Sequence, residues 1–371
     1  MTQRINITLL ILLISGLVQT SFAQNQSDST IPSTHAKNII LMIGDGMGIP
    51  QIYAAMTATA DNLNILRCTN TALVKTLSAN DDVTDSAAAG TALATGSKTN
   101  NGSIGVSTGN KPLKSILKIA EENQLSTGLV VTSEITHATP AAFVACVQNR
   151  GQASEIAKQF LNNDVDVFIG GGLDQFSNRT DKLNLIDSLK ARNYQIAYSI
   201  DELGKYKTGK LAGLLYPGHA PKVMDGRGDM LPIAVSKALD LLSQNDNGFF
   251  LMVEGSQIDF GGHDKNIKYV LTELNDFDKA VGVVLDFAEK HPETLVIITA
   301  DHETGGLTLV ENDSIKGKMQ PNFSTDHHSA SPVALFAFGK GADQFKGMID
   351  NTDVFKLMLS SYGFTKNIEK Q

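Results

Sequence analysis

The chain has 371 residues, of which 42% are hydrophobic, and carries a formal net charge of −8 at pH 7. This length and hydrophobic content allow a large buried core, so a globular protein is expected. The excess of acidic residues argues against nucleic acid as a specific partner and against anionic membrane surfaces. Two cysteines, Cys68 and Cys146, are too few for a disulfide scaffold; we favour two buried free thiols over one bridge.

Residues 1–23 have the features of a secretory signal peptide. Arg4 precedes a mostly apolar stretch from Ile7 to Val18, and Ser21 and Ala23 offer small residues for cleavage. The apolar stretch is shorter than the roughly 20 residues of a membrane span, and no later segment approaches that length. We therefore expect a secreted or periplasmic protein without a membrane anchor.

Residues 24–36 are rich in Ser, Thr, Gln and Asn and are expected to form a disordered lead-in, and no linker divides residues 37–371. The apolar and periodic patterns predict seven strands, at 38–43, 127–132, 165–169, 195–198, 249–253, 294–299 and 332–338. Helices are predicted from 86 and at 113–122, 153–161, 183–192, 231–243, 268–290 and 354–360, so that strands and helices mostly alternate along the chain. This alternation predicts one α/β domain with a mainly parallel central sheet covered by helices on both faces.

Metal-ligand side chains follow several of these strands. Asp45 comes after the first strand, Glu254 after the strand at 249–253, and Asp301 and His302 after the strand at 294–299. Open α/β sheets bind ligands beyond the carboxyl ends of their strands, so we expect these side chains to converge at one edge of the sheet.

A polar triplet before a run of small helix-forming residues places Ser86 near a helix N-terminus. Free backbone N–H groups and the helix dipole favour an anion there, which suits a nucleophile that attacks phosphate. The alternative is an ordinary cap, in which Asp85 or Ser86 only satisfies those N–H groups.

Further carboxylate and imidazole groups stand at short spacings. Asp259 and His263 are four residues apart, Asp301 and His302 are adjacent, and His328 adds another imidazole. Asp, Glu and His without thiolates suit zinc, and magnesium or manganese where only oxygen ligands gather. One such pair is common in exposed turns, but several together with Asp45 and Glu254 indicate a metal centre.

The chain resembles the alkaline phosphatases, within the wider alkaline phosphatase superfamily. The matching segments occur in the family's order and are Ile43 to Gly48, Thr84 to Ala88, His137 to Ala141, Val253 to Asp259, Thr299 to His302, and His328. The resemblance implies an alkaline-phosphatase-like catalytic domain over residues 37–371. Only 25 residues separate His302 from His328, which implies a reduced crown region.

The resemblance also implies a nucleophile, Ser86, and a phosphate-binding arginine, Arg150. It implies three metal sites, with two Zn²⁺ ions and one further ion that is usually Mg²⁺. Their ligands would be Asp45, Asp301 and His302 for the first zinc, Asp259, His263 and His328 for the second, and Asp45, Thr139 and Glu254 for the third site. The spacing to Gly339 favours His328 over His327 as the ligand.

This arrangement has a chemical rationale. Two metal ions about 4 Å apart can stabilise the entering and leaving oxygens of an in-line phosphoryl transfer. Ser86 would then form a phosphoserine, which a hydroxide carried by the second zinc would hydrolyse. The planar fork of Arg150 matches two phosphate oxygens. The alternative for Arg150 is a surface position at the end of a helical segment at 141–149.

Two positions depart from the well-known enterobacterial member of the family, which has aspartate where His137 stands and lysine where Phe260 stands. An imidazole at 137 leaves the identity of the third metal open, because it could draw zinc or cobalt into contact. Phe260 removes a cation that would help to hold phosphate, so weaker inhibition by inorganic phosphate is expected.

The interpretation is an exported, metal-dependent phosphomonoesterase that acts on small-molecule phosphate monoesters. One alternative is a phosphodiesterase of the same superfamily. Another is a non-catalytic periplasmic protein that binds metal or phosphate, which would leave the Ser86 hydroxyl without a purpose. The short crown region leaves a homodimer as an open alternative to a monomer.

Overall fold

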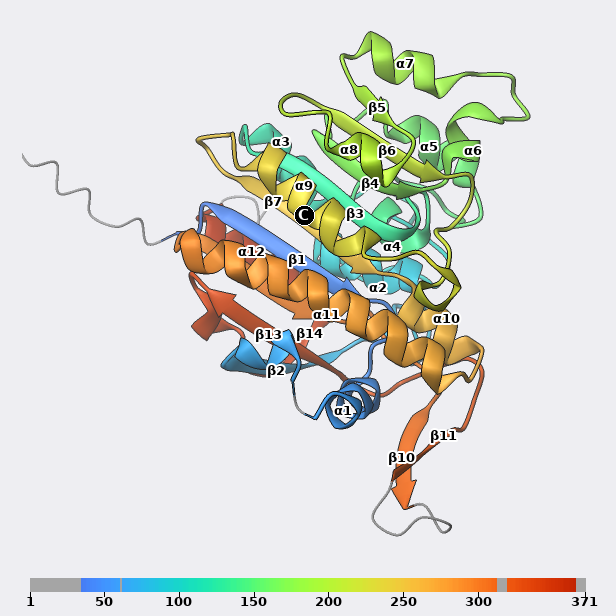
Figure 1. The fold of residues 1–371 in the computed structure, drawn as a ribbon, viewed down its shortest axis with the longest axis vertical. Helices are drawn as coiled ribbons and strands as arrows, with labels where there is room; N and C mark the ends of the chain where they lie inside the picture. The colour runs from blue at the N-terminus through green and yellow to red at the C-terminus, as the bar shows by residue number, and fades with distance from the viewer. Residues whose placement is uncertain (1–34, 61, 312–318, 365–371) are drawn as a thin grey trace, which may run out of the picture. The chain divides into compact units, whose positions relative to one another are not determined.

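The computed structural model describes residues 35–60, 62–311 and 319–364, and its centre is a ten-stranded sheet (Figure 1). The strand order across the sheet is β14 (Gly347–Asp350), β2 (Asn70–Lys75), β13 (Val333–Gly339), β8 (Thr294–Thr299), β1 (Asn38–Gly44), β7 (Phe249–Gly255), β3 (Ser126–Glu134), β4 (Val167–Gly171), β6 (Leu211–Tyr216) and β5 (Gln195–Ala197). Among these strands β13 alone runs antiparallel to its neighbours, β2 and β8. The predicted mainly parallel sheet is therefore confirmed.

Helices cover both faces of the sheet, as the sequence predicts. On one face α11 (Ile267–Lys290) packs against β1, β7 and β8, α9 (Met230–Leu242) packs against β3 and β4, and α1 (Ile49–Ala58) contacts α11 (Figure 1). On the other face α3 (Ile116–Glu122) packs against β3 and β7, and α2 (Ser86–Thr95) contacts α3, α4 (Ala138–Ala141) and α12 (Asn351–Tyr362). The remaining helices are α5 (Ala153–Gln159), α6 (Leu173–Ser177), α7 (Leu185–Ala191), α8 (Ile200–Leu203), α10 (Gln257–His263) and the short 3₁₀ turns η1 (Asn64–Arg67), η2 (Val223–Asp225) and η3 (Ala342–Gln344).

The segment between His302 and His328 is small, as expected for a reduced crown region. Its described residues form β9 (Glu303–Thr304), which pairs with β12 (His328–Ser329), and a hairpin of β10 (Leu307–Glu311) and β11 (Met319–Phe323). The hairpin projects away from the central sheet (Figure 1).

The central position of β1 explains why the strand ends meet. All seven residues of β1 are buried, and Ile43 lies beside Glu254 of β7 on one side and Thr299 of β8 on the other. Parallel neighbours end at the same edge, about 4.8 Å apart, so the residues that follow β1, β7 and β8 are brought together.

The remaining sequence expectations have mixed outcomes. The expected helix at 113–122 begins at Ile116, because Ser115 caps it by accepting a hydrogen bond from Lys118 N. The helical segment expected at 141–149 is wrong, since α4 ends at Ala141. Strands β2, β6 and β14 and helices α1 and α10 had not been predicted.

Both cysteines are free thiols, with Cys68 buried and Cys146 only partly buried. The signal peptide expected at 1–23 and most of the lead-in expected at 24–36 lie outside the described residues. Within the described ranges, no helix combines the length and the apolar character needed to cross a membrane.

Candidate active site

The predicted metal ligands lie together at the carboxyl edge of the sheet. Asp45 follows β1, Glu254 is in β7, Asp301 and His302 follow β8, and Thr139 is in α4 after β3. All five are at most 1% exposed. Asp259 and His263 come from α10 and His328 from β12. The sequence-predicted ligands are therefore brought together from several elements, and all are buried except His263 and His328, which are partly exposed.

Ser86 is the first residue of α2, a helix whose ten residues are all buried. Asp85 is the N-cap, and its carboxylate accepts hydrogen bonds from Ala88 N at 2.9 Å and Gly102 N at 3.0 Å. Because Asp85 does the capping, the Ser86 hydroxyl is not used by the helix. It lies instead 3.2 Å from Nε2 of His302.

A first group of potential ligand atoms includes this His302 nitrogen. His302 Nε2 lies 3.4 Å from Asp45 Oδ1 and 3.2 Å from Asp301 Oδ2. Ligands about 2.05 Å from a tetrahedral zinc ion stand about 3.3 Å apart, so these separations fit zinc. The same group was predicted from the sequence as the first zinc site.

A second group of potential ligand atoms has similar separations. Asp259 Oδ1 lies 3.3 Å from His263 Nε2 and 3.5 Å from His328 Nε2, and the two imidazole nitrogens are 3.3 Å apart. The His302 ring stacks on the His328 ring with centroids 3.5 Å apart, so His302 also lies within reach of this group. The neighbouring His327 side chain is 84% exposed and points elsewhere.

Several buried oxygens of the cluster have no hydrogen-bond partner. These atoms are Asp45 Oδ1 and Oδ2, Asp301 Oδ2, Glu254 Oε1 and Thr139 Oγ1. Buried carboxylates are stable only when they are paired, hydrogen-bonded or bound to a cation. The orphaned oxygens therefore fit divalent cations at these positions.

The pKa values of the carboxyl groups agree with a need for cations. Burial, together with the nearby Asp301, Asp259 and Glu254 carboxylates, raises the pKa of Asp45 well above its ordinary value. Burial likewise raises the pKa of Glu254 to about 7 and that of Asp301 to about 6. Burial opposes ionisation of Asp259 too, but hydrogen bonds from His263 and His328 outweigh it and hold that pKa well below its ordinary value.

His137 lies beside the third predicted site. Ligand atoms of Asp45, Glu254 and His137 lie within 4.8 Å of one another, and Thr139 Oγ1 forms no hydrogen bond. His137 Nδ1 also has no partner, while its Nε2 lies 3.3 Å from Arg150 Nη2. Burial, followed by the nearby Arg150, lowers the pKa of His137 to about 3, so the imidazole is neutral.

Arg150 lies at the rim of the cluster, with its side chain 30% exposed. Nη1 donates to Asp85 Oδ2 at 3.0 Å, and Nη2 faces His137. Asp85, which also caps α2, therefore holds the guanidinium near the start of that helix. This position differs from the surface alternative considered above.

Phe260 and His219 form an aromatic wall beside His137. The three rings meet edge-on, with centroid distances of 6.0 Å between His137 and Phe260, 5.6 Å between His137 and His219, and 5.3 Å between His219 and Phe260. His219 belongs to none of the sequence segments that resemble the family. It is exposed, but only the folded chain brings it to the site, and no local motif marks it.

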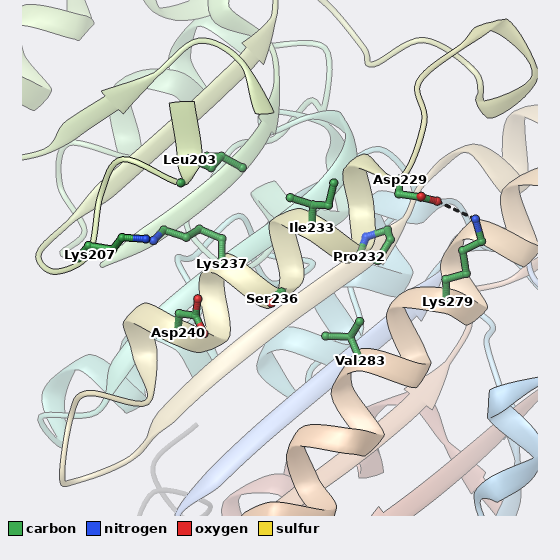
Figure 2. Close-up of a pocket in the computed structure, with 11 residues that line it drawn as sticks. Leu203, Lys207, Asp229, Pro232, Ile233, Ser236, Lys237, Asp240, Lys279 and Val283 are labelled. Carbon is green, nitrogen blue, oxygen red and sulfur yellow. Dashed lines mark hydrogen bonds and ion pairs between the residues drawn. The ribbon is translucent and has the colours of Figure 1, made fainter. Parts of the chain in front are cut away.

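A separate hollow of about 600 Å³ lies between α9 and α11 and the turn after α8 (Figure 2). Ile233 and Val283 supply apolar lining, and Asp229 pairs with Lys279 at its rim. None of the metal-ligand residues lines it. The candidate chemistry therefore belongs to the carboxyl edge of the sheet and not to this hollow.

Comparisons with known proteins agree with this geometry. The model of the alkaline phosphatase family matches residues 36–322. Alkaline phosphatase 4 of Bacillus subtilis (strain 168) is 34% identical over 411 residues, which cover 87% of this chain and 88% of the relative. Alkaline phosphatase of Escherichia coli (strain K12) is 34% identical over 88% of this chain and 86% of its own length.

The fold comparison points the same way. The structure of alkaline phosphatase from the Antarctic bacterium TAB5 superposes with a TM-score of 0.86 at 41% identity, and the match covers 89% of this chain and 99% of that one. The resemblance seen in the sequence is confirmed, and the chain belongs to the alkaline phosphatase family, as a hydrolase of phosphate monoesters.

Proposed function

We propose that this chain is an exported alkaline phosphatase that works through a phosphoserine at Ser86, with two zinc ions and one magnesium ion. The observation that carries the proposal is the position of the Ser86 hydroxyl, 3.2 Å from Nε2 of His302 at the start of α2. A serine that is buried, uninvolved in capping and next to a group of metal ligands is suited to nucleophilic attack.

The chain's own residues prepare this attack. Backbone N–H groups at the start of α2 face the position that a phosphate oxygen would take. Arg150 offers a planar fork for two non-bridging oxygens, and Asp85 holds that fork in place. Ser86 Oγ would form the new bond to phosphorus as the alcohol leaves, and water would then release phosphate from the phosphoserine.

The residues that would hold the metals are those predicted from the sequence. Asp45, Asp301 and His302 would hold one zinc, and Asp259, His263 and His328 the other. When bound, the zinc ions would supply Lewis-acid stabilisation of the entering and leaving oxygens. The separations of about 3.3 Å between ligand atoms support zinc at both positions.

Magnesium at the third site is supported by the donor atoms. If Arg150 Nη2 donates to His137 Nε2, the proton of the neutral ring is on Nδ1, which therefore offers no lone pair. Oxygens of Asp45, Glu254 and Thr139 then remain as ligands, and oxygen ligands suit magnesium. Structures of two variants of the TAB5 enzyme are described with Mg bound in their M3 site.

Export and assembly complete the proposal. The signal-like residues 1–23 support secretion or a periplasmic location, to be tested by cell fractionation and by sequencing the N-terminus of the mature protein. Exposed Ile49 and Tyr53 of α1, at 44% and 52%, support a homodimer, which light scattering would test. Dimerisation is not needed to complete the cluster, because all its side chains come from one chain.

The experiment that tests the activity uses three measurements on purified protein. Hydrolysis of an aryl phosphate is compared with hydrolysis of the matching diester, metal content is analysed, and the acid-quenched reaction is searched for phosphoserine at residue 86. We expect a clear preference for the monoester, two zinc ions per chain and a labelled Ser86. A preference for the diester would favour the phosphodiesterase alternative. Metal binding without turnover would favour the binding-protein alternative.

A further inference from the structure

Thr304 is a fully buried residue that no motif singles out. It lies in β9, two residues after His302, and pairs in register with His328 of β12. Its hydroxyl lies 2.5 Å from Asp259 Oδ1 and 3.2 Å from His302 Nδ1. One hydroxyl thus contacts a predicted ligand of each zinc site.

The chemistry of the three groups fixes the direction of both hydrogen bonds. The Thr304 hydroxyl donates its single proton to Asp259 Oδ1. Thr304 Oγ1 then accepts from His302, which requires a proton on Nδ1. In the neutral ring this leaves the lone pair on Nε2, the nitrogen that faces Ser86 and Asp45.

The backbone around Thr304 is built to admit this side chain. A Cβ on Gly46 would lie 2.7 Å from Thr304 Oγ1, and a Cβ on Gly262 would lie 2.8 Å from Thr304 Cγ2. Both distances are too short for a real contact, so neither position accepts a side chain while Thr304 is there. Gly46 follows Asp45 and Gly262 precedes His263, so ligand-bearing segments of both sites close on Thr304.

Main-chain contacts hold Thr304 itself in place. Thr304 N donates to Gly46 O at 3.3 Å, and Gln51 Nε2 donates to Thr304 O at 2.8 Å. These contacts fix the backbone from which the hydroxyl reaches Asp259 and His302. Groups that hydrogen-bond to metal ligands fix the orientation and the tautomer of those ligands.

We propose that Thr304 is a positioning residue that couples the two zinc sites, holding Asp259 in its orientation and His302 in the Nδ1–H tautomer through one hydroxyl. The proposal rests on the function proposed above. A residue that supported one zinc site only would affect metal binding at that site alone. Removing the Thr304 hydroxyl should instead weaken metal binding at both sites.

The test compares the metal-free full-length protein with three variants at this position. Thr304→Val keeps the shape and removes the hydroxyl, Thr304→Ala removes the hydroxyl and the methyl group, and Thr304→Ser keeps the hydroxyl. Thr95→Val is the matched control, because Thr95 is also fully buried but donates only to Thr91 O at 2.7 Å.

Zinc affinity is measured by competition with a chelator, resolving the two binding constants. We expect Thr304→Val and Thr304→Ala to lower both constants by about 10- to 100-fold, the usual effect of losing a partner of a metal ligand. Thr304→Ser and Thr95→Val should bind zinc like the original chain. Unchanged constants in Thr304→Val, or a loss at one site only, would overturn the coupling role.

A second readout follows the imidazole directly. Nitrogen-15 NMR of metal-free protein labelled at histidine should show His302 protonated on Nδ1 in the original chain and in Thr304→Ser, and a mixture in Thr304→Ala. Protonation on Nε2 in the original chain would contradict the proposal. If Thr304→Val does not fold, the Ser and Ala variants, which differ by one hydroxyl, decide the question.

The two proposals fail in different ways. If the original chain binds no zinc or hydrolyses no monoester, the proposed function is wrong. If the original chain does both and the Thr304 variants match it in zinc affinity, only the role of Thr304 is wrong.

Discussion

The Ser86 hydroxyl lies 3.2 Å from Nε2 of His302, although the two residues are 216 positions apart in the chain. Asp85 supplies the helix cap that would otherwise engage Ser86, and the carboxyl end of β8, at the centre of the sheet beside β1, brings His302 to it. The proposed nucleophile and a proposed metal ligand are therefore in direct contact.

Replacing Ser86 by alanine should remove the nucleophile while leaving the ligand groups in place. We expect Ser86→Ala to lose on the order of 10³-fold or more in kcat, as loss of a nucleophile does elsewhere, and to keep its zinc content. Steady-state kinetics measures the loss in kcat, and metal analysis measures the zinc content. Ser361→Ala is the control, because the buried Ser361 hydroxyl has no hydrogen-bond partner and lies outside the cluster. Full activity in Ser86→Ala would contradict the nucleophile assignment.

Replacing Arg150 by lysine should weaken phosphate binding. A lysine keeps the charge but loses the planar fork that can bind two phosphate oxygens while contacting Asp85. We expect a rise on the order of tenfold in KM and in the inhibition constant for inorganic phosphate. Arg67→Lys is the control, since Arg67 forms ion pairs with Asp286 and Glu289 at the surface, away from the cluster. If KM and the inhibition constant for inorganic phosphate are the same in Arg150→Lys as in the original chain, the guanidinium does not bind phosphate.

Introducing a cation at Phe260 should tighten phosphate binding. Phe260 is partly exposed beside His137, so a lysine there would bring an ammonium group toward the phosphate position. One added charge at short range is worth about 1–2 kcal/mol, so Phe260→Lys should lower the inhibition constant for inorganic phosphate by about 5- to 30-fold. Phe260→Leu separates the charge from the loss of the ring. If Phe260→Lys binds phosphate no more tightly than the original chain, the inference is wrong.

Zinc removal should change the pH dependence of stability. The hydrogen bond to Asp259 raises the pKa of His263 to about 9 from 6.5. In metal-free protein this group stabilises the fold fully below pH 6.5, and its contribution is lost as pH rises through about 9. Melting temperatures of metal-free protein should therefore fall between pH 7 and pH 9.

The melting temperature of zinc-loaded protein should not fall between pH 7 and pH 9, because zinc binds the deprotonated imidazole. The apparent zinc affinity should rise over the same pH interval. His263→Gln should flatten the metal-free profile, and His327→Gln, at an exposed neighbouring position, should not. A metal-free profile that is already flat in the original chain would show that His263 does not carry the effect.

Arg227 should be a strong determinant of stability outside the active site. Its side chain is 1% exposed and pairs with Glu273 and Asp276, which are both 2% exposed. Arg227→Met would leave two buried carboxylates without their cation and should lower the free energy of unfolding by about 3–5 kcal/mol. Lys279→Met breaks an ion pair with Asp229 in which both side chains are 60% exposed. This substitution should change the free energy of unfolding by at most about 1 kcal/mol. Denaturant unfolding measures both, and equal effects would contradict the argument.

The sequence predicted the elements whose signals are local. The apolar run of β1 and the long periodic pattern of α11 are determined by residues within each segment. Helix α10 was missed because it contains Gly261 and Gly262, which are poor helix formers; a Cβ at Gly261 would lie 2.7 Å from Val270 N, so close packing requires glycine there. Tertiary contacts override the local preference in that helix.

The types of ligand were determined by the sequence, but their grouping was not. Asp45, Glu254, Asp301 and His302 could be placed at one edge of the sheet because parallel strands end together. That His302 reaches both groups of potential ligands, that His137 lies beside Asp45 and Glu254, and that Thr304 joins Asp259 to His302 depended on the folded chain. Apart from the contact between Thr304 and His302, these contacts join residues tens of positions apart. Tertiary packing sets their distances, and no local pattern encodes them.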